Sequence, residues 1–542
     1  MKNSKKLLSL IACLSLLSSC NGDRIGKRYC PINPDISTPT PEPTPSETVE
    51  ELNKELFENY AIINSSNSLI GFKDNIPDEY LNLETIIVPE NINDKTITGL
   101  QSTTTSPFER FTKIRIIKLP STILNIICGW GEDEISSPFY KLKHLENIEV
   151  DLDNKWYYSK GNCLIRRNWK FDTDGNRVPN NRYELLCGWG DVEIPEEITD
   201  ILSYRLANDS SITSIKFNSN LSSSNVSTDA FRYLDNLNKI DLNGNTNFKL
   251  EGNVLYSNNN IYAAYDEVEI PSSLSSFSLY AYTSISSVKL HASVNNFSPN
   301  CFVKLPKLSK IDLNGNTKCS LEGNCLYSQE TIYALYNDVT IPKSITVLSI
   351  PNFLSVTSIN LHDNVKSISN FDNLKIKSIY IPASVTYLQY DTFKSCKELV
   401  NIEIDPGNYY WKTKDNVVYR KSADKRFIFA CGDAIIPDDL TSDFESNDYL
   451  TFAYCPSVRS LTIHNKFNYL KTTSFSKLNE DFKTLNFTGT IAEFKQRKFK
   501  YKESADFSLY DQFKKYSSIT VNFYNNTGST VDTYKMSELE NL

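Results

Sequence analysis

Apolar residues recur in two linked patterns along most of this chain. The first is a ladder with an apolar residue at every third position, as at Phe231, Leu234 and Leu237. The second is an apolar–polar–apolar triplet directly after the ladder, such as the triplet that ends at Leu242. A period of three predicts a short helical or 3-10 segment, whereas alternation predicts a strand with one buried face. Together the patterns predict a repeating unit of one strand and one return segment.

This unit recurs from end to end. The last apolar residue of each triplet is separated from the next by 20 to 44 residues, at Val88, Leu119, Val150, Ile194, Phe217, Leu242, Ile270, Leu290, Leu313, Ile341, Leu361, Ile381, Ile404, Ile436, Ile463 and Phe487. Such spacing is typical of leucine-rich repeats. We therefore predict an α/β repeat solenoid, a curved stack with one long parallel sheet, short helical or 3-10 return segments and occasional β-hairpins.

A longer repeat is superimposed on the short one. Residues 231–256 return almost letter for letter as residues 301–327, and both copies contain IDLNGNT followed by LEGN. Asn253 and Asn324 lie 71 residues apart, and fainter copies begin at Phe139 and Phe393. Repetition at a fixed offset indicates a stacked scaffold, so function is expected where the copies differ.

The middle residue of each triplet is predicted to project from the exposed face of the sheet. In stacking order these residues include Glu193, Lys216, Asp241, Glu269, Lys289 and Asp312, and then the neutral Thr340, Asn360 and Tyr380. Opposite charges on adjacent strands stabilise a sheet. Glu149/Glu193 and Asp241/Glu269 break the alternation, and either long insertions or curvature would separate them. The six charged residues and Tyr380 are candidate binding residues on this face.

The first residues have the pattern of an export signal. Lys2, Lys5 and Lys6 precede a short apolar run, and the run ends in Leu17-Ser18-Ser19-Cys20, which resembles a bacterial lipobox. We predict a lipoprotein signal peptide at 1–19 and lipidation of Cys20, with an ordinary signal peptide cut near Ser19 as the alternative. The N-terminal lipid would then be the sole membrane contact of a protein anchored to the bacterial membrane, at the cell surface or outer membrane.

The remaining boundaries follow from composition. Residues 20–47 are rich in proline and predict an extended stalk. Residues 48–75 are assigned to an N-terminal cap with a helix over 47–60, residues 76–490 to the solenoid and residues 491–542 to a C-terminal cap. A basic run between Lys495 and Lys502 fits either a solvated cap face or contact with an anionic polysaccharide.

Catalytic chemistry finds little support in the sequence. A net charge of −8, from 57 basic and 65 acidic residues, argues against nucleic-acid binding. We find no phosphate loop, nucleophile elbow or paired-histidine motif, and predict no enzyme activity, no catalytic residue, no metal ligand and no cofactor. Asp241 and Asp312 lie three turns apart, which is too far for a glycosidase pair. The ten cysteines after Cys20 fit buried core thiols better than disulfides, although their even number permits disulfides.

Aromatic residues are the remaining candidates for binding. Trp156, Tyr157 and Tyr158 are aligned with Tyr409, Tyr410 and Trp411, just before two of the predicted hairpins. Exposed, such side chains contact partners or sugars, whereas their repetition at one position favours packing of at least one of them. Trp156 and Trp411 are retained as candidate binding residues.

Several stretches resemble the BspA-like, or treponemal-type, leucine-rich repeat family. IPKSITVL at Ile341 and IPASVTYLQYDTFKSCKELVNIEI at Ile381 are close to its repeat, and VPENINDKTITGL at Val88 and FTGTIAEF at Phe487 resemble its opening and closing repeats. The resemblance implies a secreted or surface-attached bacterial protein, since some members bind host proteins or other cells. We predict a non-enzymatic surface binding protein, an adhesin or protein-interaction module with a protein or cell-surface ligand. The alternatives are a glycan-binding or glycan-processing lipoprotein and a structural envelope protein.

Overall fold

The computed structural model describes residues 48–542 except 104, 128–136, 140–141, 175–176, 207–210, 423–426, 438–451, 466–474, 476–477, 479–480, 497–507 and 526–527. The predicted signal peptide, Cys20 and the stalk therefore lie outside the described residues. The chain from Thr48 onward forms one compact unit. It is a β-solenoid with little helix, which confirms the predicted fold class.

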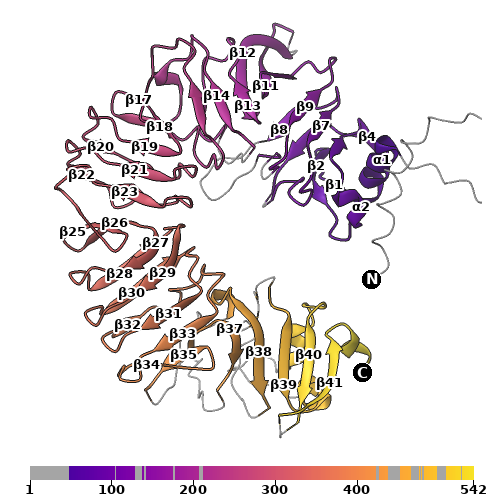
Figure 1. The fold of residues 1–542 in the computed structure, drawn as a ribbon. Coiled ribbons are helices and arrows are strands. Elements are labelled where there is room, and N and C mark those ends of the chain that lie inside the picture. The colour runs from indigo at the N-terminus through magenta and orange to yellow at the C-terminus, as the bar shows by residue number, and fades with distance from the viewer. Residues whose placement is uncertain are drawn as a thin grey trace, which may run out of the picture. The chain divides into compact units, whose positions relative to one another are not determined.

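Every predicted triplet lies at a short parallel strand, and these main strands follow one another in chain order (Figure 1). The first apolar residue of each triplet points into the core, as Ile117 and Ile215 do, while the middle residue faces outward. The main strands are β3 (Thr85–Ile87), β7 (Ile116–Leu119), β9 (Asn147–Val150), β13 (Asp191–Glu193), β14 (Ser214–Lys216), β15 (Lys239–Asp241), β19 (Glu267–Glu269), β21 (Ser287–Lys289), β23 (Lys310–Asp312), β27 (Asn337–Thr340), β29 (Val356–Asn360), β31 (Ser378–Ile381), β33 (Asn401–Ile404), β37 (Gly432–Ile435), β38 (Val458–His464), β39 (Thr484–Thr488) and β40 (Thr520–Tyr524).

The main strands form several short sheets instead of the single long sheet that the pattern predicts. Hydrogen bonding joins β3-β7-β9, β13-β14-β15, β19-β21-β23, β27-β29, β31-β33 and β37 to β40. Three-stranded antiparallel meanders occupy four of the breaks. They are meander 1, of β10 (Tyr157–Lys160), β11 (Cys163–Phe171) and β12 (Arg177–Gly188); meander 2, of β16 (Lys249–Glu251), β17 (Val254–Ser257) and β18 (Asn260–Ala264); meander 3, of β24 (Ser320–Glu322), β25 (Cys325–Ser328) and β26 (Thr331–Leu335); and meander 4, of β34 (Trp411–Lys414), β35 (Val417–Arg420) and β36 (Phe427–Ala430).

The return segments combine turns with a second column of short strands. The period-three ladder closes single i+3 to i hydrogen bonds, for example Leu237 N–H to Leu234 O at 3.3 Å, so it has 3-10 geometry without a continuous helix. Separate 3-10 turns are η1 (Ser223–Asn225), η2 (Phe452–Tyr454) and η3 (Glu538–Asn541). The second column comprises β2 (Ser68–Phe72), β6 (Gly99–Gln101), β8 (Asn125–Ile127), β20 (Ser276–Phe277), β22 (Asn296–Phe297), β28 (Val347–Pro351), β30 (Ser367–Asp372) and β32 (Tyr387–Leu388).

The N-terminal end of the stack is covered by a helix, as predicted. Helix α1 (Val49–Tyr60) begins with a capping box between Thr48 and Glu51 and buries Leu56 and Phe57. The buried amide of Asn53 donates to Thr85 O at 3.0 Å and accepts from Ile87 N–H at 2.9 Å, so the helix satisfies the free edge of β3. An open sheet edge would invite pairing with another chain. Strand β1 (Ala61–Ile63), helix α2 (Asp78–Leu81) and the hairpin of β4 (Asn91–Ile92) and β5 (Lys95–Thr96) complete this end.

The other end closes with an antiparallel strand. β41 (Thr530–Lys535) pairs with β40, and helices α3 (Ile491–Gln496) and α4 (Leu509–Phe513) supply Phe494 and Phe513 to the core. Among the described residues, no helix has the length and apolar character needed to cross a membrane.

The positions of the described cysteines agree with the prediction that they are buried in the core. The eight described cysteines are buried: Cys163, Cys187, Cys301, Cys319, Cys325, Cys396, Cys431 and Cys455. All of these except Cys187 are free thiols. Burial raises the pKa of Cys301 and Cys396 to about 12, so these thiols stay protonated and unreactive near neutral pH. Cys30 and Cys128 lie outside the described residues.

Candidate functional site

The LEGN phrase is the turn that interrupts the parallel sheet. Gly252 and Asn253 both have positive φ, +55° and +59°, as a two-residue hairpin turn requires. Gly252 O accepts from Glu269 N–H at 2.8 Å, and Asn253 Nδ2 donates to Glu267 O at 3.0 Å. The turn thus takes the place of a neighbouring strand. The same two bonds recur at the turns of meanders 1, 3 and 4, so the breaks in the sheet are built features.

The NGNT phrase supplies a buried asparagine. Asn245 is 4% exposed, and its Nδ2 donates to Asn218 O and Leu221 O in the preceding turn, both at 2.8 Å. Its Oδ1 accepts from Asn247 N–H at 2.8 Å. Asn154, Asn316 and Asn408 make the same set of bonds. The repeated asparagine of the NGNT motif therefore stabilises the scaffold.

The predicted charge alternation exists on the exposed face. Lys216 Nζ lies 2.7 Å from Glu193 Oε1, and Lys289 Nζ lies 2.8 Å from Glu269 Oε1. The hydrogen bonds that the lysines donate to the glutamates raise the pKa of Lys216 and Lys289 most. Asp241 and Asp312, on the next strand, raise it further. All these groups are solvent-exposed, where an ion pair contributes little to stability.

Of the two explanations for the like-charged exceptions, insertion is the correct one. Meander 1 separates Glu149 from Glu193, and meander 2 separates Asp241 from Glu269, so neither pair lies on hydrogen-bonded strands.

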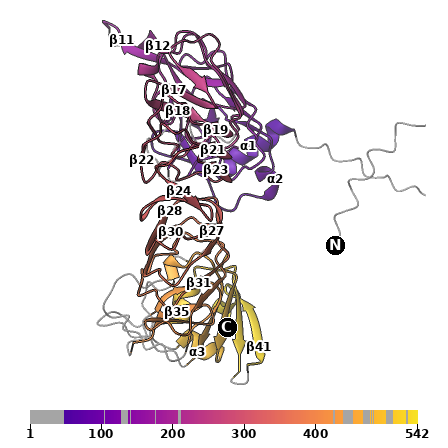
Figure 2. The same ribbon diagram turned by 60° about the vertical axis from the view of Figure 1, so that its left-hand side comes forward.

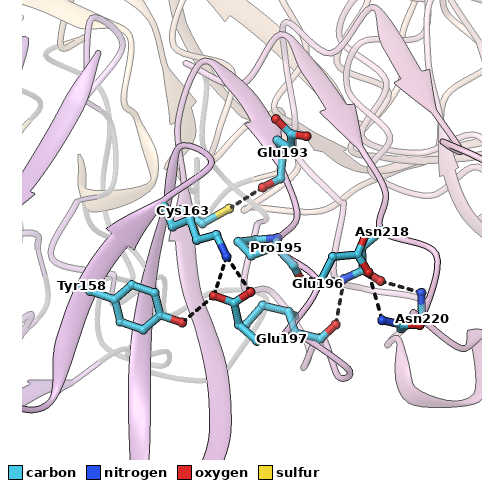
Figure 3. Close-up of polar contacts among 10 residues, drawn as sticks. Tyr158, Cys163, Glu193, Pro195, Glu196, Glu197, Asn218 and Asn220 are labelled. Carbon is cyan, nitrogen blue, oxygen red and sulfur yellow. Dashed lines mark hydrogen bonds and ion pairs between the residues drawn. The ribbon is translucent and has the colours of Figure 1, made fainter.

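Meander 1 is held to the next turn by polar contacts that Figure 3 shows. Glu197 accepts from Lys160 Nζ at 2.8 Å and from Tyr158 Oη at 3.1 Å. Burial opposes ionisation of Glu197, but these bonds prevail and hold its pKa below the usual value. Burial first, and then Glu197, raises the pKa of Tyr158. The group is therefore a structural ion pair at the base of the meander.

The structure corrects the predicted register of the aromatic residues by one position. Trp156 corresponds to Tyr410, and Tyr157 to Trp411, because Asn154 and Asn408 accept hydrogen bonds from these two pairs of backbone N–H groups. Trp411 is only 5% exposed and packs in the core, so its assignment as a binding residue was wrong.

Trp156 is half-buried against the core, and Tyr380 is 47% exposed on the sheet face. Tyr380 donates its hydroxyl to Asp405 Oδ2 at 2.6 Å. Of the three aromatic residues retained as candidates, Trp156, Tyr380 and Trp411, Tyr380 is the most exposed.

The four meanders differ at two exposed positions; Tyr409 and Tyr410 were considered there from the sequence, but Trp156 and Trp411 were retained instead. The third residue after the repeated asparagine is buried in each meander, as Tyr157, Phe248, Cys319 and Trp411. The two residues before it face outward and vary: Lys155 and Trp156, Thr246 and Asn247, Thr317 and Lys318, Tyr409 and Tyr410. Tyr409 is 79% exposed. Aligning the four copies on the repeated asparagine would have identified these variable positions from the sequence.

Meander 1 also differs in length. Its strands β11 and β12 extend well past β10, which pairs only with residues 163–166. Residues 167–171 of β11 and 177–183 of β12 therefore form a two-stranded ribbon that projects beyond the neighbouring strands (Figure 2). Near its tip Trp169 and Phe171 are 37% and 61% exposed, with ring centroids 5.1 Å apart. Leu152, at the start of the same repeat, is wholly exposed.

The base of this ribbon is anchored by charge. Glu184 of β12 accepts from Arg166 of β11 and from Arg205 of the next turn. The Glu184 and Arg205 side chains are almost completely buried, so breaking this network would leave an uncompensated buried charge. The ribbon is therefore presented on a fixed base.

Comparison with known proteins identifies a repeat family. The model of the BspA type leucine rich repeat region matches six copies, over residues 176–309, 245–353, 333–419 and 425–536. No curated protein is significantly similar to the chain in sequence.

Three solved structures are similar at low identity. A leucine rich cell surface protein from Faecalibacterium prausnitzii is 16% identical, with 64% of this chain and 92% of that chain covered and a TM-score of 0.22. A leucine-rich repeat protein from Bacteroides ovatus is 14% identical, with 64% and 87% covered and a TM-score of 0.21. The pneumococcal vaccine antigen PcpA is 14% identical, with 61% and 66% covered and a TM-score of 0.21. The family model covers more than half of the chain, and the chain therefore belongs to the BspA type leucine-rich repeat family.

Proposed function

We propose that this protein is a non-enzymatic binding protein of the bacterial cell surface, and that it docks a protein partner on the ribbon of meander 1. The exposed pair of Trp169 and Phe171 on that ribbon is the observation that carries the proposal. Tryptophan and other large aromatic residues dominate the binding energy of protein interfaces. A two-stranded ribbon is only marginally stable in water by itself, so residues 167–171 and 177–183 gain most from a partner that covers them.

The surface location also belongs to this proposal. BspA type repeat proteins are typically bacterial surface proteins. Cys20 would carry the lipid, and the proline-rich residues 20–47 would hold the solenoid away from the membrane. Cys20→Ala is expected to move the protein from the membrane fraction to the soluble fraction. Retention of the variant in the membrane fraction would refute the lipid anchor.

The docking proposal is tested on cells that display the full-length protein. The double variant Trp169→Ala/Phe171→Ala is compared with the unaltered protein on an array of purified extracellular host proteins. Loss of a central aromatic pair is expected to reduce the affinity for the protein partner at least about tenfold.

Val531→Ala is the matched control, because Val531 is as exposed as Phe171 but lies on β41. It should leave binding unchanged. Equal binding by the ribbon variant and the unaltered protein, or no saturable binding to any protein on the array, would overturn the proposed docking site.

A further inference from the structure

Meander 4 has a solvent-facing hollow at its first strand. Its volume is about 600 Å³, and its walls include Gly407, Tyr409, Tyr410, Arg420 and Lys421. Hollows of this size accommodate small ligands or short segments of larger ones. None of these residues belongs to the ribbon of meander 1, so the hollow is a separate candidate site.

The two tyrosines are held in place from below. Asn408 is fully buried, and its Oδ1 accepts from the backbone N–H groups of Tyr410 and Trp411, both at 2.9 Å. The Tyr409 and Tyr410 rings meet edge to face with centroids 5.1 Å apart. They are 79% and 42% exposed, so apolar ring faces and phenol hydroxyls are both available to a ligand. A sugar ring combines an apolar C–H face with hydroxyl groups and matches this pair of features.

Positive charge borders the tyrosines. The Arg420 guanidinium lies 5.6 Å from the centre of the Trp411 ring, and no carboxylate of the described residues lies within ion-pair distance of it. Lys421 Nζ is fixed by Pro406 O at 3.0 Å and by Asn408 O at 2.5 Å. A guanidinium binds carboxylate or sulfate groups through two parallel hydrogen bonds. The hydrogen bond from Tyr380 lowers the pKa of the Asp405 carboxyl most, and the nearby charge of Lys421 lowers it further. Arg420 is therefore the cation of the hollow that remains for an anionic ligand.

The other meanders lack this combination at the same positions. Where meander 4 has Tyr409 and Arg420, meander 2 has Thr246 and Ser257. Meander 3 likewise has threonine and serine there.

Meander 1 does have a cation at the position of Arg420, which is Arg166. Arg166 is paired with Glu184, and the nearby Lys160 with Glu197. Both of these positive charges are therefore neutralised by carboxylates of the protein itself. Among the four meanders, exposed tyrosines and an arginine without a described acidic partner coincide in meander 4.

We infer that the hollow of meander 4 binds an acidic glycan, a polysaccharide whose sugars bear carboxylate or sulfate groups. Tyr409 and Tyr410 contact the sugar rings, and Arg420 binds the anionic substituent. This inference is independent of the protein-docking proposal, because the two sites lie on different meanders and respond to different substitutions.

The test is calorimetric titration of the chain carrying Cys20→Ala, which removes the lipidation site and leaves every described residue intact. The probes are a heparin oligosaccharide, which is sulfated, a polygalacturonate oligosaccharide, which bears carboxylates alone, and neutral dextran. We expect saturable binding of at least one acidic probe and none of dextran. Tyr409→Thr/Tyr410→Asn, which installs the residues of meander 2, and Arg420→Ser should each reduce that affinity about tenfold or more.

Lys318→Ser in meander 3 is the control, because it removes one exposed positive charge without touching the hollow. It should leave affinity unchanged, and Arg420→Lys should restore part of what Arg420→Ser loses. Unchanged thermal unfolding verifies that each variant is folded. Binding of neither acidic probe, equal binding of dextran, or equal losses with Arg420→Ser and Lys318→Ser would overturn the inference. A heparin-only result assigns the site to sulfated glycans, and a polygalacturonate result assigns it to carboxylates.

Discussion

Meanders 2 and 3 are almost copies of each other, whereas meanders 1 and 4 depart from them in opposite ways. At the two exposed positions, meander 2 presents Thr246 and Asn247, and meander 3 presents Thr317 and Lys318. Meander 1 lengthens two strands into a ribbon, and meander 4 keeps its length but exposes two tyrosines and an arginine. All four use the same buried asparagine and the same two-residue turn. The scaffold residues and the proposed binding residues thus occupy different positions within one repeat.

The largest effect is expected from the shared asparagine. Asn245→Ala in meander 2 removes three hydrogen bonds, Asn408→Ala in meander 4 removes four, and both leave buried backbone groups unsatisfied. Each should lower the free energy of unfolding by about 3 kcal/mol in urea titrations. The exposed Asn364→Ala is the control. A loss at only one of the two positions would show that the meanders do not share one scaffold.

A smaller loss is expected at the turn. Gly252→Ala should destabilise by about 2 kcal/mol, because φ is +55° and a Cβ would lie 2.3 Å from Glu269 O. Gly244 also has positive φ, +78°, but a Cβ there meets no atom within 4 Å. Gly244→Ala should therefore cost about 1 kcal/mol, the conformational term alone. Equal unfolding free energies for the two variants would refute the close packing of the turn against the next strand.

The residues in which meander 1 differs from meanders 2 and 3 are expected to contribute to partner binding and almost nothing to the free energy of unfolding. Trp169→Ala is expected to change the free energy of unfolding by less than about 0.5 kcal/mol, since the ring is partly solvated. Binding of the protein partner should fall in the same variant. A large stability loss, measured by urea unfolding, would mean that the ribbon is part of the scaffold.

The hydrogen bond between Tyr380 and Asp405, on the sheet face near meander 4, predicts a pH effect. The Tyr380 hydroxyl, and then Gly407 N–H, lower the pKa of Asp405, while the same hydroxyl bond raises the pKa of Tyr380. Since the folded-state pKa of Asp405 is depressed, its contribution is present above the unfolded value and is lost as pH falls through the folded value. Tyr380→Phe should raise the pKa of Asp405 in a carboxyl NMR titration. An unchanged pKa would show that the hydrogen bond does not form in solution.

The smallest effect is expected from the charge alternation. Lys216→Met removes an exposed ion pair with Glu193 and should leave the midpoint of urea unfolding unchanged at physiological salt. A clear shift of the midpoint would show that the exposed face contributes more than surface ion pairs usually do.

The sequence predicted the scaffold well because the scaffold is what repeats. Each triplet marks a strand, since a buried residue such as Ile215 must recur wherever the core continues. Subdivision of the sheet was not foreseen, because the turn at Gly252 replaces a strand through backbone bonds that leave no apolar pattern. Trp411 was misassigned because composition does not distinguish a buried aromatic from its exposed neighbour Tyr409. That difference follows from the position of Asn408, which the alignment had shifted by one residue.

The turn has one more consequence, for how such chains change length. Its contacts to the next strand run through Gly252 O and Asn253 Nδ2 to backbone atoms, so they do not depend on which side chains follow. Removal of residues 253–323 would join Gly252 to Asn324 and regenerate the same turn against β27. Whole cycles are therefore exchangeable modules, and duplication or loss of one leaves both flanking joints chemically intact. Duplication or deletion within the gene can therefore lengthen or shorten the solenoid in steps of 71 residues, and each new boundary would use the same two-residue turn.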